Sequence, residues 1–409
     1  MDYNILFLFV IFNKNIFKFI AIFTKALEKD FILLYNNLAK TMQIYIVNIG
    51  NRKKRMKNFK RIGVLTSGGD APGMNAAVRA AVRVALTRGV EVMAIYRGYS
   101  GLIHGDIKPL GMRDVSNIIN RGGTILYSDR CPEFKTEEGM QCAVDTCKRF
   151  GIDGIVTLGG DGTFRGATDL TAHGIPCVGV PCTIDNDITS TDATIGFDTA
   201  MNTVTDIIDK LRDTCESHAR CNVVEVMGRG AGDIALNTAI ASGATAVIVP
   251  EFPYDDNSIC KKISAAKALG KRNFIVIVSE GVGSDYAPAL AKKIQIETGV
   301  ETKFARLAHI VRGGNPTLRD RVLASKMGTY AAEELLRGNS NVVVCERKGK
   351  IVTNEINYAL ILDRMYKGTL KEGDLDKFPE EEIARMKREI EDKREHLLDL
   401  FSVVNKINL

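Results

Sequence analysis

The sequence PCTIDND at residues 181–187 directly follows the short apolar run CVGV at residues 177–180. A continuous apolar run of this length is typical of a buried strand. Two carboxylates two residues apart, with an amide between them, are an unusual way to leave such a strand. Ligands of parallel α/β sheets bind at the carboxyl ends of the strands, so these residues predict a substrate site. Asp and Asn also favour turns, and a plain polar turn is the alternative for this stretch taken alone.

Two further apolar runs end in the same way. Residues 155–158 lead into GGDGT at 159–163, and residues 62–65 lead into TSGGD at 66–70. Glycines let backbone N–H groups approach phosphate oxygens, and the helix start that follows adds positive potential. An aspartate in such a loop can hold Mg²⁺ against the phosphates. Since the P-loop pattern GxxxxGK[ST] is missing from the sequence, these residues predict a sugar or nucleotide kinase outside the P-loop class.

Composition places the chain among globular proteins. It has 409 residues, 45% hydrophobic and 25% charged, which suggests two or three domains. The net charge of +6 owes much to residues 49–61, which hold seven Lys or Arg and no acid. The rest has no basic patch with interleaved aromatics and the chain has no Trp, so we expect no nucleic-acid binding. The nine Cys lack metal or CxxC spacing, and we expect reduced thiols in a cytoplasmic protein.

Residues 1–57 differ from the rest of the sequence. Their longest uninterrupted apolar run, residues 5–12, is too short to span a bilayer. A signal peptide is a weak alternative, because the charged first region and an A-x-A cleavage site are missing. We expect an N-terminal extension that is not part of the fold, and no association with a membrane.

From about residue 58 onward, strand and helix patterns alternate, which predicts an α/β fold with mostly parallel sheets. Apolar periodicity predicts helices at residues 74–86, 141–150 and 198–212, and a charged amphipathic helix at residues 379–400. Continuous apolar runs at 246–249 and 274–278 predict buried strands. We also expect a turn at residues 97–101 and a short helix beginning at residue 115.

Six of these motifs resemble one known family. Residues 62–77, IGVLTSGGDAPGMNAA, closely resemble the opening of bacterial 6-phosphofructokinases of the ATP-dependent type. Further matches follow in the family's order: GGDG at 159–162, TIDND at 183–187, GFDTA at 196–200, EVMGR at 225–229 and RGG at 312–314. The resemblance extends from about residue 59 to residue 367.

The resemblance implies the phosphofructokinase-like fold, with two Rossmann-like three-layer α/β/α domains. The larger, ATP-binding domain is expected at residues 58–196 plus 310–365. The smaller, sugar-phosphate-binding domain is expected at residues 197–309 plus 366–409. The implied glycolytic reaction is Mg²⁺-dependent transfer of the γ-phosphoryl of ATP to the 1-hydroxyl of D-fructose 6-phosphate. The implied assembly is a cytoplasmic homotetramer with sites shared between subunits.

The resemblance also assigns residues to sites. The expected catalytic residues are Asp185, as general base, Thr183 and Arg229. The expected ATP-binding residues, with Asp161 as the Mg²⁺ ligand, are Gly69, Arg130, Cys131, Gly160, Asp161, Gly162 and Thr163. The expected substrate-binding residues are Thr183, Ile184, Asp185, Arg220, Met227, Gly228, Arg229, Glu280, Lys303, His309, Ile310, Val311 and Arg312. The basic residues that match an allosteric effector site are Arg79, Arg83, Arg212 and Lys271.

Several positions depart from the family pattern. Cys182 stands where Gly or Lys is usual, and pyrophosphate-using relatives carry Lys there together with Asp at the position of Gly162. Gly162 therefore favours ATP over pyrophosphate as the donor. Lys303 replaces an Arg and keeps the charge without the bidentate geometry. Thr245 replaces a metal-binding Glu of the effector site and Leu269 replaces a basic residue, so we expect weak allosteric control.

Two other functions compete with an ATP-dependent kinase. The first is the pyrophosphate-dependent form of the same enzyme. The second is a catalytically silent regulatory subunit that binds sugar phosphate. Intact Asp161, Asp185 and Arg229 argue against a silent subunit, because such a protein has no need of a general base.

Overall fold

The structure is a computed structural model, and it describes residues 59–407. The described residues belong to a single compact unit. The predicted N-terminal extension lies outside the described residues and stays a prediction. None of the helices within residues 59–407 has the length and apolar character that a membrane crossing requires.

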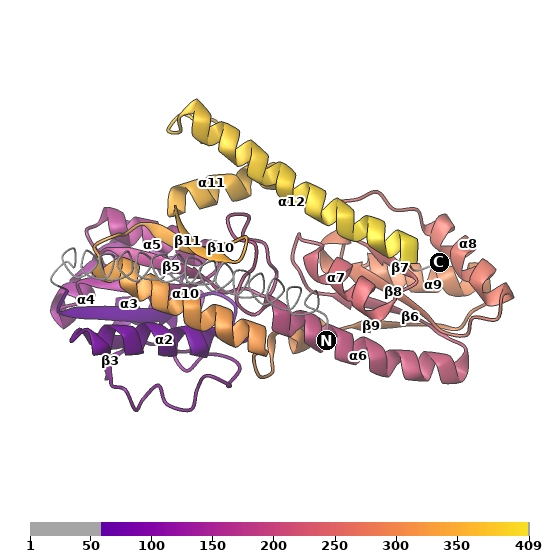
Figure 1. Ribbon diagram of the computed structural model, residues 1–409, viewed down its shortest axis with the longest axis horizontal. Helices are drawn as coiled ribbons and strands as arrows, with labels where there is room; N and C mark the ends of the chain where they lie inside the picture. Colours follow the sequence, from indigo (N-terminus) through magenta and orange to yellow (C-terminus); the bar gives the residue numbers. More distant parts are fainter. Residues whose placement is uncertain (1–58, 408–409) are drawn as a thin grey trace, which may run out of the picture. The chain divides into compact units, whose positions relative to one another are not determined.

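The larger sheet has seven strands in the order β11-β10-β5-β4-β1-β2-β3 (Figure 1). The five central strands run parallel, and the edge strands β3 and β11 are antiparallel to their neighbours. The strands are β1 (Arg61–Thr66), β2 (Glu91–Ile95), β3 (Ile107–Leu110), β4 (Gly154–Gly159), β5 (Cys177–Pro181), β10 (Val342–Arg347) and β11 (Lys350–Glu355). Helices on both faces explain why the central strands are continuously apolar.

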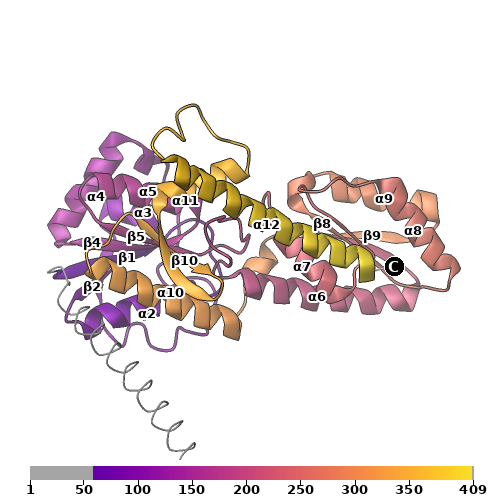
Figure 2. The ribbon, with the colours of Figure 1, turned by 45° about the horizontal axis from the view of Figure 1, so that its top comes forward.

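Helices cover the two faces of this sheet. One face carries a core cluster built with four helices, namely α3 (Gly98–His104), α4 (Glu137–Phe150), α5 (Asp161–Ala172) and α11 (Ile356–Tyr366). The other face packs against α2 (Met74–Thr87) and α10 (Leu318–Leu336), which lie along each other (Figure 2). A short 3₁₀ helix, η1 (Pro132–Lys135), precedes α4.

The second sheet has four parallel strands in the order β7-β8-β6-β9. They are β6 (Cys221–Val226), β7 (Ala246–Ile248), β8 (Phe274–Ser279) and β9 (Thr302–Arg306). The helices around it are α6 (Phe197–His218), α7 (Asp233–Ser242), α8 (Asp256–Ala268) and α9 (Tyr286–Thr298). Two short 3₁₀ helices, η2 (Glu280–Val282) and η3 (Ala308–Arg312), follow β8 and β9. The last helix, α12 (Glu380–Ile407), packs against α7 and α11 (Figure 1).

A buried carboxylate joins the elements of the two sheets. Asp320, in the first turn of α10, accepts hydrogen bonds from the backbone N of Gly196, at 2.9 Å, and of Thr199, at 2.8 Å. It also accepts one from the Thr199 hydroxyl, at 2.6 Å. These donors belong to the start of α6, where helix N–H groups have no partners within the helix. A carboxylate at this end also interacts favourably with the helix dipole.

The predicted α/β class with mostly parallel sheets is confirmed, and so are the four predicted helices, each somewhat longer than its sequence pattern. The domain boundaries within residues 58–409 stay a prediction.

Two local predictions were wrong. Residues 98–104 form α3 rather than a turn, because Tyr99 and Leu102 are spaced for one helix face and both are buried. Residues 112–117 form turns rather than a helix. Asn117 has a left-handed backbone, with φ of 57°, which a right-handed helix does not accommodate.

Candidate active site

Three loops meet at the carboxyl ends of β1, β4 and β5, as their sequences predicted. The backbone N of Ser67 donates to the carbonyl of Leu158 at 2.9 Å, and the Thr163 hydroxyl donates to the carbonyl of Ser67 at 3.1 Å. The backbone N of Cys182 donates to the carbonyl of Gly159 at 2.9 Å. These bonds hold the 66–70, 159–163 and 181–187 segments side by side.

Asp185 is a buried carboxylate with one oxygen that no described residue binds. The residue is 3% exposed, and its Oδ1 is buried without a hydrogen-bond partner within residues 59–407. Its backbone N donates to the Thr183 hydroxyl at 3.2 Å. The pKa of the Asp185 carboxyl is raised to about 6, mainly by burial and then by Asp187, while Arg229 opposes the shift. The carboxyl can therefore take up a proton close to neutral pH.

Arg229 reaches these carboxylates from the four-stranded sheet. Its Nε lies 3.8 Å from Asp185 Oδ2, and its Nη1 lies 3.3 Å from Asp187 Oδ2. The backbone N–H groups of Gly228 and Arg229 both donate to Glu280 Oε1, at 3.3 and 2.8 Å. Arg229 has a positive φ of 55°, a costly conformation for a residue with a side chain. Glu280, which follows β8, therefore fixes the turn that directs Arg229 toward residues 181–187, the acidic loop.

The 159–163 loop has the features of an oxygen-rich phosphate and metal site. Asp161 begins α5, and its Oδ1 is buried without a partner among the described residues. Its other oxygen, Oδ2, pairs with Arg165 at 2.6 Å. A Cβ added at Gly160 or at Gly162 would meet nothing within 4 Å, so the backbone there borders open space. A free carboxylate oxygen is the donor that Mg²⁺ prefers, and a helix N-terminus favours phosphate.

The 66–70 loop contacts both Arg312 and the 128–131 segment. A Cβ at Gly69 would collide with the Arg312 guanidinium, so Arg312 of η3 lies directly against this loop. The Ser128 hydroxyl bonds to the carbonyl of Gly68, which ties the segment carrying Arg130 and Cys131 to the first loop. Residues from four separate parts of the chain thus surround the carboxyl ends of β1 and β4.

Other predicted sugar-phosphate residues show mixed exposure. Ile184 and Val311 are buried, His309 and Ile310 are exposed, and Met227 is partly exposed at the end of β6. The exposed pair lies on η3, three and two residues before Arg312.

Arg220 and Lys303 do not join this cluster. They stand at the amino ends of β6 and β9, whereas Arg229 follows the carboxyl end of β6. The six residues of β6 span roughly 20 Å, so Arg220 and Arg229 lie at opposite ends of the sheet. Glu301 pairs with Arg220 at 2.7 Å and with Lys303 at 3.0 Å, and these contacts lower the pKa of Glu301 to about 2.

The four predicted effector residues form two separate pairs. On α2, burial and the neighbouring Arg83 guanidinium lower the pKa of Arg79, and Arg83 Nε is buried with no partner in the described chain. Beside the four-stranded sheet, burial and the nearby Arg212 lower the pKa of Lys271. Arg212 also donates to the Asn273 side chain at 2.8 Å. Each pair therefore brings two positively charged side chains close together.

Three residues that hold the acidic loop and the residues just after it in place were not predicted from the sequence. They are Lys367, Asp363 and Lys393. Lys367 Nζ donates to the Asp187 carbonyl at 3.2 Å and lies 3.4 Å from its Oδ2. Asp363 accepts from the backbone N of Thr189 at 2.6 Å, and burial raises its pKa to about 6. Lys393, on α12, donates to the carbonyl of Asn186 at 3.1 Å. The available signal was a lysine within an apolar stripe of the last helix.

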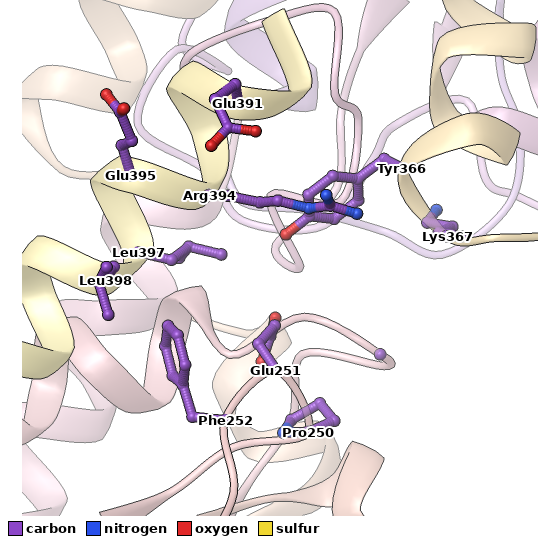
Figure 3. Close-up of a pocket in the computed structure, with 11 residues that line it drawn as sticks. Pro250, Glu251, Phe252, Tyr366, Lys367, Glu391, Arg394, Glu395, Leu397 and Leu398 are labelled. Carbon is purple, nitrogen blue, oxygen red and sulfur yellow. The ribbon is translucent and has the colours of Figure 1, made fainter. Parts of the chain in front are cut away.

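A hollow of about 590 Å³ lies beside these groups, between α12 and the segment after β7. In Figure 3, Glu251 and Phe252 line one side, and Arg394 points from α12 toward Tyr366 on the other. Gly230, next to Arg229, lines the same hollow. The hollow therefore lies next to the turn that carries Arg229.

Comparisons with known proteins agree on one family. The sequence model of the family described as Phosphofructokinase matches residues 61–335. A Bacillus velezensis protein named ATP-dependent 6-phosphofructokinase is 55% identical over 298 residues, 73% of this chain and 93% of that relative. A protein of the same name from Clostridium acetobutylicum is 53% identical over 308 residues, 75% of this chain and 96% of the relative.

Among solved structures, phosphofructokinase from Saccharomyces cerevisiae is similar, with a TM-score of 0.71 and 32% identity. The match covers 78% of this chain and 47% of the yeast chain, so this chain spans about half of the yeast protein's length.

Proposed function

The chain belongs to the phosphofructokinase family, and we infer that it catalyses the ATP-dependent 6-phosphofructokinase reaction of glycolysis. It transfers the γ-phosphoryl of ATP to the 1-hydroxyl of D-fructose 6-phosphate, which yields fructose 1,6-bisphosphate and ADP. The observation that carries this function is the 55% identity to an ATP-dependent relative over 93% of that relative's length.

We propose that Asp185 is the general base. Its buried Oδ1 has no partner in the described chain, so it is available to accept the proton of the 1-hydroxyl as that oxygen attacks phosphorus. A pKa of about 6 leaves most of the carboxylate ionised at pH 7 and still basic enough for proton transfer. Thr183 orients the Asp185 backbone, and Arg229 offsets the negative charge of the loop. Positioning and charge neutralisation supply most of such a reaction.

On the donor side, we assign ATP to the glycines of the first two loops and to the Arg130–Cys131 segment. Open space beside Gly160 and Gly162 supports this assignment, because phosphate oxygens can approach the backbone there. The free Oδ1 of Asp161 suits Mg²⁺, which when bound neutralises charge on the phosphoryl oxygens. Asp161 would hold the metal, and the N–H groups at the start of α5 would face phosphate.

For the sugar phosphate, we assign Met227, Gly228, Arg229, Glu280 and the residues of η3 to fructose 6-phosphate. Cationic Arg229 and Arg312 suit the 6-phosphate, and the Glu280 carboxylate suits sugar hydroxyls.

Arg220 and Lys303 stand at the far end of β6 and β9, which supports a role in the site of a neighbouring subunit. We therefore propose a homotetramer with shared sites. The separate Arg79–Arg83 and Arg212–Lys271 pairs would bind an anionic effector across a subunit boundary. The cytoplasm, where glycolysis operates, is the proposed location.

One assay tests this function directly. Purified full-length protein is given fructose 6-phosphate with MgATP or with magnesium pyrophosphate, and fructose 1,6-bisphosphate is measured. We expect product with ATP and at least about 100-fold less with pyrophosphate, since a site built for one donor leaves polar groups unpaired with another. Product with pyrophosphate alone would establish the alternative donor, and binding of sugar phosphate without product would establish a silent subunit.

A further inference from the structure

The inward face of α12 carries a lysine in a position where an apolar residue is expected. Met386, Ile390, Leu397 and Val404 are the buried residues of this helix. Lys393 follows Ile390 by three positions and precedes Leu397 by four, so it occupies the same stripe. Its half-buried side chain needs polar partners, because an ammonium group without them is costly to bury.

Lys393 contacts the acidic loop of the candidate active site, and its Nζ also lies over the Tyr366 ring, 5.3 Å from the ring centroid. Its Nζ donates to the carbonyl of Asn186 at 3.1 Å. Asn186 lies between the two aspartates and has a left-handed backbone, with φ of 52°. This conformation is unfavourable for a residue with a side chain, so surrounding contacts must hold it.

Those contacts fix both the side chain and the backbone of Asn186. Its Oδ1 accepts from the backbone N of Thr194 at 3.0 Å, and its Nδ2 donates to Asp233 Oδ1 at 3.0 Å. The bond from Lys393 satisfies the remaining carbonyl. Lys367 donates to the carbonyl of Asp187, the next residue. Two lysines thus bind the backbone carbonyls of two consecutive residues of the turn.

The helix that carries Lys393 is itself anchored on both sides. Toward the seven-stranded sheet, Arg385 donates to Asn354 Oδ1 on β11 at 2.9 Å, and Glu389 accepts from the Tyr358 hydroxyl on α11 at 3.1 Å. Toward the four-stranded sheet, Phe401 stacks on Phe252 with ring centroids 4.6 Å apart. The Lys393 side chain therefore extends to the loop from a helix that is held in place by contacts on both sides.

We propose that Lys393 is a positioning residue for phosphoryl transfer, which holds the turn from Asp185 to Asp187 in its productive geometry. This inference rests on the proposed function. It also makes α12 a part of the catalytic apparatus, although this helix lies beyond residues 61–335, which the family model matches.

The test compares three full-length variants with the unmodified protein. Lys393→Met keeps a long side chain that suits the apolar stripe but removes the donor. Lys393→Arg restores a cationic donor. Lys387→Met is the matched control, because Lys387 is an exposed lysine on the same helix with no hydrogen bond or ion pair in the described structure.

For Lys393→Met we expect kcat to fall by about 10- to 100-fold, because small displacements of catalytic groups carry penalties of this size. The KM values for ATP and fructose 6-phosphate should stay within about threefold, since the lysine bonds to a backbone carbonyl of the loop and is not among the residues assigned to either substrate. The melting temperature should stay close to that of the unmodified protein. Lys393→Arg should recover most of the lost kcat, and Lys387→Met should match the unmodified protein.

A kcat of Lys393→Met within about twofold of the unmodified protein would overturn the proposal. So would a loss that Lys393→Arg fails to recover, or one that follows the fraction of unfolded protein. If Lys393→Met does not fold, Lys393→Gln takes its place, because its shorter side chain draws the donor away from the carbonyl. Failure of the proposed function is recognised separately, since the unmodified protein would then form no fructose 1,6-bisphosphate from ATP.

Discussion

Replacing Asp185 with asparagine should strongly lower kcat and at the same time make the protein more stable. Asparagine has nearly the same shape, and its backbone N can keep the bond to the Thr183 hydroxyl, which lies at 3.2 Å. It cannot accept the substrate proton, and removal of a general base typically lowers kcat by about 10²–10⁴-fold.

The gain in stability follows from the pKa of the Asp185 carboxyl. That pKa is raised from 3.8 to about 6 in the folded protein. The folded state therefore holds the proton more tightly than the unfolded state, and the carboxyl lowers the free energy of unfolding as pH rises through this window. Two pKa units correspond to about 3 kcal/mol, with the full cost present above pH 6 and none below about pH 4. Asparagine does not titrate, so the variant avoids this cost.

The assay is a pair of thermal melts at pH 8 and at pH 4.5, together with kcat at pH 8. Asp185→Asn should melt higher than the unmodified protein at pH 8, and the difference should shrink strongly at pH 4.5. The matched control is Asp206→Asn on α6, whose carboxylate is exposed and pairs with Lys210 at the surface; its melting temperature should change little. A lower melting temperature for Asp185→Asn at pH 8, or near-normal kcat, would refute the reasoning about burial and proton transfer.

Three further outcomes are expected. Gly162→Asp should raise the KM for ATP at least about tenfold by like-charge repulsion and leave the melting temperature unchanged, since a Cβ there meets nothing within 4 Å; an unchanged KM would place ATP elsewhere. Asp320→Ala should lower the free energy of unfolding by roughly 3 kcal/mol or more, measured by urea denaturation, because three donors at the start of α6 lose their partner. With ADP or phosphoenolpyruvate near millimolar concentration, the half-saturating fructose 6-phosphate should shift by less than about fivefold, the lower end of usual allosteric coupling. Thr245 offers no carboxylate and Leu269 is 90% exposed without a charge, so a larger shift would mean that other residues complete the effector site.

The α/β class of the fold could be predicted from the sequence alone, and so could the grouping of three loops at one edge of the larger sheet. Apolar runs that end in Gly, Asp and hydroxyl residues are local patterns, and parallel strands bring their carboxyl ends to one edge of a sheet. For that reason the 66–70, 159–163 and 181–187 loops could be grouped from their residues alone. The same local rules failed at residues 97–101, where buried Tyr99 and Leu102 favour a helix over a turn.

The electrostatic environment of Asp185 and the contacts that hold its loop arise from packing between distant parts of the chain. A pKa depends on burial and on charges that lie close in space. Here burial and then Asp187 raise the pKa, and Arg229 and Arg312, which follow other strands, oppose the shift. Glu280 fixes the Arg229 turn from 51 positions away in the chain, and Lys393 reaches Asn186 across 207 positions. No periodicity encodes such contacts, because they arise from packing between elements rather than from the spacing of residues within one element.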